Sequence, residues 1–546
     1  MTNAYDFIIV GAGSSGCVLA NRLSANPNVS VLLIESGPVD KSPLIDMPRG
    51  IGKILAPGNA HVWDYKASQG KGRVLEDWLK GRTLGGSSSV NGMVYLRGHP
   101  DEYDGWEADG CTGWGWKDIG RCYKAMEDHE LGEAEWRGTG GPLKISMQPS
   151  GNPLCEAIIA AAGEAGLPRV EDLNSALQGG IGYQPRNIWR GRRQSAAKAF
   201  LAPVRSRSNL TVLTSTDVLR VVFEGRRAVG VELRDASGMS IVSAKREVIL
   251  SAGALNTPRI LQLSGVGPAE KLRELGIDVV IDAPGVGQHL LEHRCVLVQI
   301  RLKKGSLNQA LTGLGLAKSL AQYFIQGKGP LTHAAHEVCA FFKTRPELTR
   351  PDAELGIGLY SITSEEGKIV LEKEPGMTWV GYFTNPDSQG SVMITSRDPN
   401  AALTIEANYL TTENDRRGSI AILRFMRKIL EQPALRPHIV AETLPGPLCV
   451  TDDELAEAFF KHGSTAYHAA GTCRMGADAA SVVDPQLRVR GIEGLRVVDT
   501  SIMPTLITGN TNGPAMAMAM RAAEIIIANQ QSAAPLDVAD LSVMTH

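Results

Sequence analysis

The sequence predicts an α/β fold, α+β overall, in which a Rossmann-like dinucleotide-binding domain is joined to a second domain with a largely antiparallel sheet and helices. The chain of 546 residues is longer than one ordinary core supports, so two or more domains are expected. Near the N-terminus, apolar runs at 7–10 and 31–34 flank a glycine-rich turn and a helical pattern. Farther on, alternating segments such as 377–383 and 390–395 indicate a separate sheet.

The glycine-rich turn has the spacing of a dinucleotide-binding fingerprint. Gly11 allows the tight turn, Gly13 lets backbone N–H groups approach a pyrophosphate, and Gly16 lets helix and strand pack closely. Glu35 ends the second apolar run, near the position about 20 residues on where an acid binds a ribose hydroxyl. Because the flanking strands, the helix and the acid all fit, a dinucleotide site is favoured over a plain turn.

The composition is that of an ordinary globular protein with a small-molecule partner. Hydrophobic residues make up 43% and charged residues 21%, and a net charge of −2 with mixed signs gives no basic face for nucleic acid. The eight cysteines form no CxxC pair, which argues against a metal site and a disulfide framework. Reduced thiols, the lack of a positively charged leader and the lack of an apolar run of about 18 residues predict a cytoplasmic protein without a spanning helix.

One apolar segment allows two interpretations. Leu307, Leu311, Leu314, Leu320 and Phe324 recur with roughly helical spacing. A helix that packs into the core is the favoured interpretation. The alternative is a helix that covers an active site or touches a membrane surface, which would place the protein peripherally at the inner membrane.

A second loop of small residues runs from Gly81 to Gly92. Its glycines and serines let the backbone approach a bulky planar or phosphorylated ligand, and Asn91 can donate and accept hydrogen bonds at a ring edge. The apolar residues 93–96 that follow favour a tethered, buried loop over a flexible one. Arg192 and Arg193, at the start of a predicted helix, meet either a phosphate or solvent.

The remaining elements predict a nucleotide-binding domain that is interrupted in sequence. Strands are expected at 210–213, 218–223, 229–233, 246–253 and 495–498, and helices at 119–126, 154–165 and 515–528. The predicted domains are residues 1–150, 195–302 and 455–530 for the dinucleotide, residues 151–194 and 303–454 for the substrate, and residues 531–546 as a C-terminal tail.

The last third of the chain carries the residues with the clearest chemistry. His468 follows Tyr467 in a segment of small residues, and Asn510 lies in a loop that also contains Thr511 and Asn512. A histidine with an ordinary pKa of about 6.5 is largely neutral near pH 7 and can accept a hydroxyl proton. Asn510 could donate a hydrogen bond to the developing alkoxide. A lone histidine in such a segment is more often structural; the motif and the later loop favour a catalytic role.

Taken together, these motifs resemble the glucose-methanol-choline (GMC) oxidoreductases from about Tyr5 to Asn529. The match rests on the fingerprint with Glu35, the loop 81–91, the segment 253–267, the Tyr467-His468 pair and Asn510. The resemblance is strongest to the bacterial branch that contains choline dehydrogenase, aliphatic alcohol dehydrogenases, polyethylene glycol dehydrogenase and hydroxymethylfurfural oxidase.

The resemblance implies FAD as cofactor, bound without a covalent link because Val90 stands where some relatives carry a histidine bonded to the flavin. The predicted cofactor-binding residues are Gly11, Gly13, Ser14, Ser15, Gly16, Glu35, Ser36, Trp63, Gly81, Arg82, Thr83, Gly86, Ser87, Asn91, Gly92, Met93, Val218, Tyr467, Asp499, Thr500 and Thr511. The chain departs from the family at His289, Leu291 and Glu292, where relatives usually carry asparagine, glutamine and aspartate.

The implied activity is the oxidation of a primary alcohol, aromatic or medium-chain aliphatic, to the aldehyde, with hydride transfer to flavin N5. His468 is the predicted base and Asn510 its partner, and oxygen or a quinone or other carrier accepts the electrons. A choline-type dehydrogenase is less favoured because no cationic-substrate cage is evident. A non-redox flavoprotein of the same fold is a further alternative, whereas a NAD(P)-linked dehydrogenase would leave the loop 81–92 unexplained.

Three histidines and one asparagine have less definite roles. His99, His333 and His336 lie outside the motifs, and a structural or surface role is expected for them. Asn512 is either a loop-stabilising amide or a second substrate contact.

Overall fold

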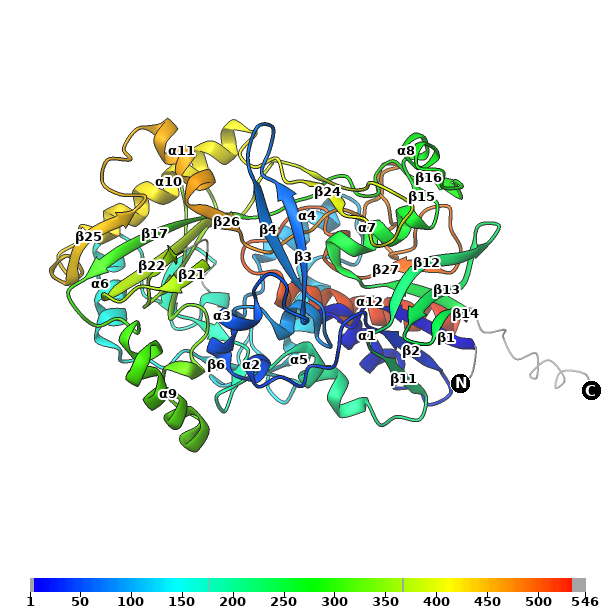
Figure 1. Ribbon diagram of the computed structural model, residues 1–546, viewed down its shortest axis with the longest axis horizontal. Coiled ribbons are helices and arrows are strands. Elements are labelled where there is room, and N and C mark those ends of the chain that lie inside the picture. The colour runs from blue at the N-terminus through cyan, green and yellow to red at the C-terminus, as the bar shows by residue number, and fades with distance from the viewer. Residues whose placement is uncertain (1–3, 176, 366–367, 533–546) are drawn as a thin grey trace, which may run out of the picture.

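The computed structural model describes residues 4–175, 177–365 and 368–532. Figure 1 shows two large sheets at opposite ends of the molecule, with the β3–β4 hairpin between them. The mixed α/β fold predicted from the sequence is confirmed.

The first sheet has the strand order β11-β2-β1-β14-β13-β12, with β27 paired to β14. Its strands are β1 (Ala4–Val10), β2 (Val31–Ile34), β11 (Leu210–Leu213), β12 (Asp217–Glu224), β13 (Arg227–Asp235), β14 (Gly238–Leu250) and β27 (Leu495–Val497). Strands β11, β2, β1, β14 and β27 are parallel to their neighbours in this part of the sheet, and β12 and β13 continue it as antiparallel strands. Their apolar runs are buried because helices cover the sheet.

Two helices from opposite ends of the chain pack on this sheet. Helix α1 (Ser14–Leu23) follows β1 directly, and α12 (Asn512–Ser532) contacts it. A Cβ at Gly16 would lie 1.9 Å from the carbonyl oxygen of Gly11, so only glycine permits this approach of helix and strand. Ser14, the first residue of α1, donates to Asn512, the first residue of α12, so the N-termini of both helices lie together beyond the end of β1.

The second sheet has the order β25-β17-β22-β19-β18-β7, with β26 paired to β17, and is antiparallel throughout. Its strands are β7 (Gly180–Tyr183), β17 (Arg294–Leu302), β18 (Val338–Phe342), β19 (Ala353–Gly358), β22 (Gly376–Phe383), β25 (Ile439–Leu444) and β26 (Gly463–Thr465). Helices α6 (Pro153–Glu164), α10 (Glu413–Leu430) and α11 (Asp452–Lys461) share its hydrophobic core.

A four-stranded sheet joins the two ends of the molecule. Strands β3 (Val62–Ser68) and β4 (Leu75–Gly81) form a hairpin, and β24 (Leu403–Glu406) joins β3 to β23 (Ser391–Ile394). The other elements are α2 (Pro43–Asp46), α3 (Ile51–Ile54), α4 (Pro100–Ala108), α5 (Trp116–Met126), α7 (Gly253–Leu263), α8 (Ala269–Glu274), α9 (Gly313–Gln326), β5 (Glu127–His129), β6 (Leu143–Met147), β8 (Pro185–Arg186), β9 (Ile188–Trp189), β10 (Arg192–Arg193), β15 (Val266–Gly267), β16 (Ile281–Asp282), β20 (Ile362–Glu365) and β21 (Lys368–Leu371).

Three sequence predictions need correction. Strands β17 and β26, assigned above to the dinucleotide domain, pair in the second sheet, because a buried apolar strand has the same sequence pattern in either sheet. The strand expected at 246–253 ends at Leu250, and helix α7 begins at Gly253. Residues 192–193 form a short strand, and the helical turn that follows starts at Ala197. The domain division otherwise remains a prediction. Residues 533–546 of the predicted C-terminal tail lie outside the described residues.

No helix within the described ranges is both long and apolar enough to cross a membrane. All eight cysteines are unpaired.

Candidate active site

A cavity of about 810 Å³ opens between the carboxyl ends of the first sheet's parallel strands and the second sheet. The wall from the first sheet includes Val10 and Ile34, and the wall from the second includes Val380 and Tyr382. Every predicted catalytic and cofactor-binding residue lines this cavity except Gly16 and Thr83. Gly16 acts through helix packing, and the buried Thr83 donates from Oγ1 to the carbonyl of Pro38, 2.9 Å away.

The fingerprint end of the cavity is shaped for a close backbone approach. Gly11 has φ +97°, and a Cβ there would lie 2.5 Å from the carbonyl oxygen of Ser251. A Cβ at Gly86 would lie 2.7 Å from the Cα of Gly13, so the two glycine loops touch backbone to backbone. Glu35 accepts backbone N–H bonds from Ala12 (3.0 Å) and Gly37 (2.9 Å), and burial raises its pKa to about 7.

Two further polar residues, Asp499 and Asn91, hold segments of the cavity wall in place by hydrogen bonds. Asp499 ends the strand pattern of β27 and accepts bonds from Thr257 Oγ1 (2.6 Å) and the N–H of Gly253 (2.9 Å), which holds the start of α7. The predicted ring-edge contact Asn91 has its Oδ1 bound by the N–H of Met93 and by Arg193. Arg193 is buried and pins this loop through bonds to the carbonyls of Ser88 and Asn91, so it does not face solvent.

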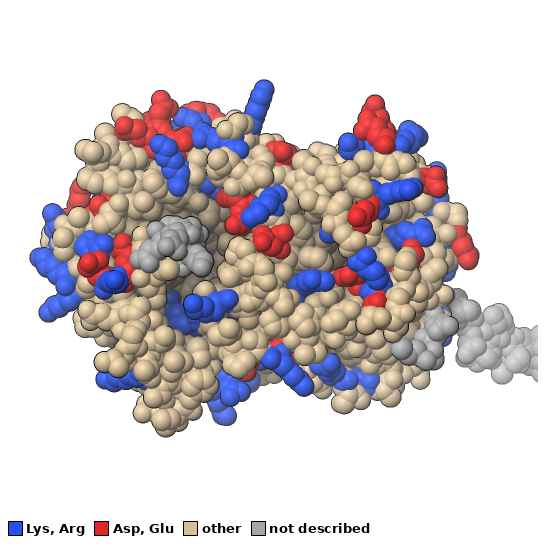
Figure 2. All heavy atoms as spheres, viewed as in Figure 1, with Lys and Arg blue, Asp and Glu red and all other residues tan. Residues whose placement is uncertain are grey.

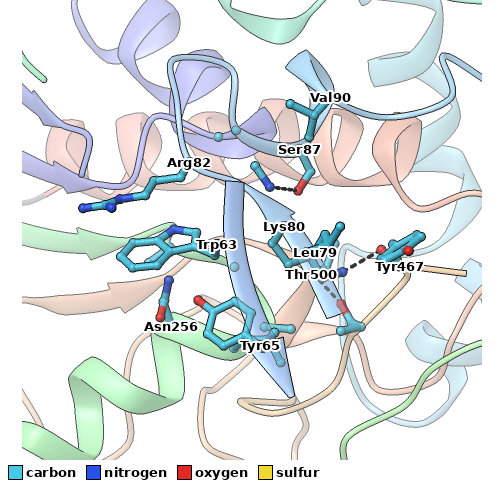
Figure 3. Close-up of a pocket in the computed structure, with 18 of the residues that line it drawn as sticks. Trp63, Tyr65, Leu79, Lys80, Arg82, Ser87, Val90, Asn256, Tyr467 and Thr500 are labelled. Carbon is cyan, nitrogen blue, oxygen red and sulfur yellow. Dashed lines mark hydrogen bonds between the residues drawn. The ribbon is translucent and has the colours of Figure 1, made fainter. Parts of the chain in front are cut away.

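The cavity also presents polar atoms that lack partners within the protein. Arg82 Nε and Ser251 Oγ are buried and unbonded, and both residues line the cavity. The guanidinium of Arg82 lies 4.4 Å from the ring centroid of Trp63, and Figure 3 shows the two side chains side by side. A large ligand with hydrogen-bonding and planar parts would satisfy these groups, which fits FAD.

The predicted catalytic pair is assembled at the other end of the cavity. Asn510 Nδ2 lies 3.0 Å from His468 Nε2, and the two residues are 42 positions apart in sequence. Behind them, His293 Nδ1 lies 2.9 Å from His468 Nδ1, and His293 Nε2 lies 2.8 Å from the carbonyl oxygen of Thr384. These three contacts form one chain from Thr384 to Asn510.

The chain of contacts determines the protonation of both rings. The carbonyl of Thr384 can only accept, so His293 carries its proton on Nε2. Burial lowers the pKa of His293 to about 3, which keeps the ring neutral and leaves Nδ1 as an acceptor. His468 must then donate from Nδ1, and because burial, His293 and Lys80 hold its pKa well below 6.5, its Nε2 bears a lone pair that accepts from Asn510 Nδ2. That lone pair faces Asn510 inside the cavity.

Comparison with known proteins agrees with this arrangement. Sequence profiles described as GMC oxidoreductase match residues 5–295 and residues 386–519. The chain belongs to the GMC oxidoreductase family. An alcohol dehydrogenase (acceptor) of Pseudomonas putida is 39% identical over 541 residues, with 96% of each chain covered. An oxygen-dependent choline dehydrogenase of Rhizobium meliloti (strain 1021) is 38% identical over 532 residues, again with 96% of each covered.

Solved structures support the same assignment. A pyridoxine 4-oxidase from Mesorbium loti has a TM-score of 0.86 and 32% identity, covering 95% of this chain and 98% of its own. A formate oxidase of Aspergillus oryzae has a TM-score of 0.89 and 26% identity, covering 97% and 99%. The chain is therefore an FAD-binding, alcohol-oxidising enzyme of the GMC type.

In this GMC oxidoreductase, the peptide between Tyr467 and His468 is held from two sides. Tyr467 has φ +63°, a left-handed conformation that is unusual for an aromatic residue. Its carbonyl accepts a bond from Lys80 Nζ (2.6 Å), and the N–H of His468 donates to Glu292 Oε1 (2.7 Å). Figure 3 shows Lys80 reaching from β4 to Tyr467. Lys80 and Glu292 thus form a clamp that fixes the strained peptide and the imidazole after it.

Glu292 is one of the departures from the family noted in the sequence, and it is buried. Burial raises its pKa to about 7 against the opposing effect of Lys80, and burial lowers the pKa of Lys80. His289, another departure, has φ +58° and places Nε2 2.7 Å from the carbonyl oxygen of Pro504. Both residues therefore make hydrogen bonds to the backbone of the segments that lead to the predicted catalytic residues.

The charge of Lys80 is expected to set the pH range of the reaction. Lys80 helps to lower the pKa of His468, so Lys80→Gln, which keeps a donor for Tyr467 but loses the charge, should raise that pKa. The acid limb of the pH profile of flavin reduction should then move to higher pH. Lys80→Arg, which keeps the charge, is the control. An acid limb at the same pH in all three proteins would remove Lys80 from this role.

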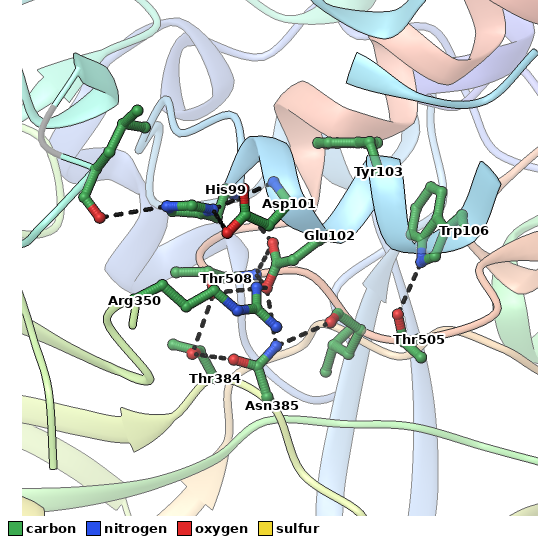
Figure 4. A network of polar contacts seen from close by, with 12 residues as sticks. His99, Asp101, Glu102, Tyr103, Trp106, Arg350, Thr384, Asn385, Thr505 and Thr508 are labelled. Atoms are coloured by element: carbon green, nitrogen blue, oxygen red, sulfur yellow. Dashed lines mark hydrogen bonds and ion pairs between the residues drawn. The ribbon is translucent and has the colours of Figure 1, made fainter. Parts of the chain in front are cut away.

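A buried polar network supports the loop that carries Asn510. Glu102, on α4, accepts bonds from the N–H and hydroxyl of Thr508 (2.8 and 2.7 Å) and from Asn385 Nδ2 (2.8 Å), and pairs with Arg350 at 2.7 Å. Asn385 directly follows Thr384, whose carbonyl binds His293. Figure 4 shows these side chains converging on the Glu102 carboxylate. One carboxylate therefore braces the segments at both ends of the chain of contacts from Thr384 to Asn510.

The substrate-side wall of the cavity is mainly apolar. The second-sheet strands contribute Cys295, Leu297, Val380, Tyr382, Ser464 and Thr465, with no carboxylate among them. Tyr382 stacks on His293 with ring centroids 4.7 Å apart, and its hydroxyl donates to the buried Glu354. His336, for which the sequence predicted a structural or surface role, lies on the cavity wall, and burial lowers its pKa to about 4.

The other residues with open roles are now placed. His99 caps α4 through its side chain and His333 contacts Glu337 at 3.1 Å, both structural positions. Asn512 Oδ1 accepts from Ser14 Oγ at 2.8 Å, which ties the last helix to the first. Sequence reasoning missed Lys80 and His293, since a lone charged or imidazole side chain in a strand or loop gives no spacing signal; only the unusual segment 289–292 pointed to their surroundings.

Proposed function

We propose that this GMC oxidoreductase oxidises a primary alcohol, aromatic or medium-chain aliphatic, to the aldehyde with His468 as the base. The observation that carries the proposal is the chain from Thr384 through His293, which leaves His468 neutral with its Nε2 lone pair facing the cavity. An alcohol that replaces the 3.0 Å contact between Asn510 Nδ2 and His468 Nε2 would donate its proton to Nε2 and accept a hydrogen bond from Asn510 Nδ2.

The protein's part in the reaction is position and proton transfer. As the hydroxyl proton moves to His468 Nε2, the Nδ1–H bond to His293 keeps the imidazole in place, and the amide of Asn510 stabilises the charge that develops on oxygen. Bound FAD would supply the acceptor for the hydride at flavin N5. Leu297 and Val380 on the second-sheet wall offer apolar contacts to the carbon chain or ring of such an alcohol.

The apolar wall favours an uncharged substrate over choline. A quaternary ammonium group is bound by aromatic faces and carboxylates, and the strands β17, β22 and β26 offer no carboxylate to the cavity. Choline remains the second candidate because relatives 38% identical carry the name choline dehydrogenase. We propose oxygen or a quinone as the electron acceptor, on the support of relatives named as oxygen-dependent and as acceptor-linked dehydrogenases.

The test is the visible spectrum of the purified protein without oxygen, before and after addition of benzyl alcohol, 1-octanol or choline. Bleaching of the flavin band by the first two, and not by choline, is the expected result, and the rate at which colour returns in air separates oxidase from dehydrogenase. Bleaching by choline alone would replace the proposed substrate class. A flavin spectrum that no alcohol changes would contradict the proposal.

A further inference from the structure

Helix α9 (Gly313–Gln326) exposes large apolar side chains to solvent. Leu314 is 92% exposed, Phe324 68% and Ile325 81%. In Figure 1 the helix projects from the lower left of the molecule, away from both large sheets. Apolar residues this exposed along one helix mark an interaction surface more often than chance placement.

The exposed residues form one stripe at helical spacing. Leu314, Ala317, Lys318, Ala321, Phe324 and Ile325 are all exposed and recur every three or four residues. The opposite side of the helix, with Leu320 and Tyr323, packs against Met47 and Leu331. Only one side of α9 therefore packs into the core, as the sequence led us to expect for the helix. The other side is mainly apolar and is not covered by any of the described residues.

The charge around the stripe is mainly positive, and Asp46, the acid beside it, is paired with Lys198 and lies 3.9 Å from Arg192. Lys318 lies within the stripe and Lys328 just beyond its end, and the chain has no aspartate or glutamate from 293 to 336. The exposed Arg190 and Arg192 flank Gly191 in the turn from β9 to β10, which lies beside Gly327, since a Cβ at Gly191 would lie 2.6 Å from the Gly327 carbonyl oxygen. The α9 end of the molecule in Figure 2 is tan with blue side chains beside it and no red on the visible face.

We propose that this face of α9 docks on an anionic lipid bilayer, with the helix lying in the plane of the interface. Apolar side chains would enter the headgroup region while Lys318, Lys328 and the neighbouring arginines meet lipid phosphates. A second copy of the chain fits less well, because two such faces would bring like charges together.

Docking would also bring the bilayer close to the wall of the cavity. The benefit of this position for the reaction rests on the proposed function. Met47, under the helix, is followed by Ile51 and Leu55, and Leu331 is followed by Ala335 and His336; all four of these later residues line the cavity. An apolar alcohol or a quinone dissolved in lipid would then have a short path to the site.

The test is co-sedimentation of the FAD-loaded protein with vesicles of phosphatidylglycerol and phosphatidylcholine in equal parts, and with phosphatidylcholine alone. The protein should sediment with the anionic vesicles, less so at high salt. Phe324→Ser with Ile325→Ser should lower the bound fraction at least tenfold, and Lys318→Glu with Lys328→Glu should remove the preference for anionic lipid. Ile241→Ser is the matched control, since Ile241 is 56% exposed on β14, away from α9.

Failure to sediment with anionic vesicles at low salt, or equal sedimentation of all variants, would overturn the proposal. A dimer in solution that the Phe324 and Ile325 changes dissolve would assign the face to a second copy instead. Flavin absorbance confirms that each variant is folded, and bleaching by alcohol is measured on the same preparations without lipid. A loss of vesicle binding and a failure of the proposed activity are thus separate results.

Discussion

His468→Ala is expected to lower the rate of flavin reduction by an alcohol by about 10²–10⁴-fold while the protein keeps its FAD. The alanine removes the Nε2 lone pair that faces Asn510, and no other neutral base contacts the amide of Asn510 among the described residues. The cofactor end of the cavity, which the loops around Gly13 and Gly86 shape, is untouched by the change. The measurement is anaerobic stopped-flow reduction at saturating alcohol.

His438→Ala serves as the control for this experiment, because His438 lies in a short turn before β25 and does not line the cavity. The control should reduce at the rate of the unchanged protein. Reduction of the His468→Ala protein at the original rate would eliminate the base assignment, and loss of FAD from it would show that His468 supports the cofactor instead.

His293→Leu is expected to slow flavin reduction by about 10²-fold although residue 293 does not face the cavity's predicted substrate position. Leucine cannot accept the Nδ1–H of His468, so the imidazole loses both its orientation and the bond that keeps the proton off Nε2. A ring with its proton on Nε2 would donate toward the alcohol oxygen and could not act as base. The same anaerobic measurement applies, with kcat and KM determined separately.

His293→Gln separates tautomer control from packing. A glutamine amide can donate to the Thr384 carbonyl and accept from His468 Nδ1, so it should restore most of the rate lost in the leucine variant. The loss in His293→Leu should fall on kcat more than on KM, since the Asn510 contact remains. Equal rates in the glutamine and leucine variants would indicate that His293 acts through packing alone.

Local patterns in the sequence were sufficient for the elements of the dinucleotide site. Apolar runs and glycines predicted β1, α1 and β2, because a strand, a turn and a helix each depend on residues close in sequence. The same reasoning misassigned β17 and β26, because strand patterns do not reveal which sheet a strand joins. It also missed Lys80, whose importance comes from the peptide it contacts 387 positions away.

The sequence by itself determined the fold class and the glycine framework and predicted the pair His468 and Asn510, through short-range patterns and the resemblance they carry. Only the tertiary structure decided the protonation of His468, because that depends on His293 and Thr384, which reach it from 175 and 84 positions away. The tertiary structure also decided which side of α9 is buried. Helical periodicity shows that the helix has apolar residues on both sides, but it does not show which side packs against the rest of the protein. Contacts between distant segments arise only when the chain packs. These contacts determine which side chains are buried away from water and which nitrogen of a buried histidine carries the proton.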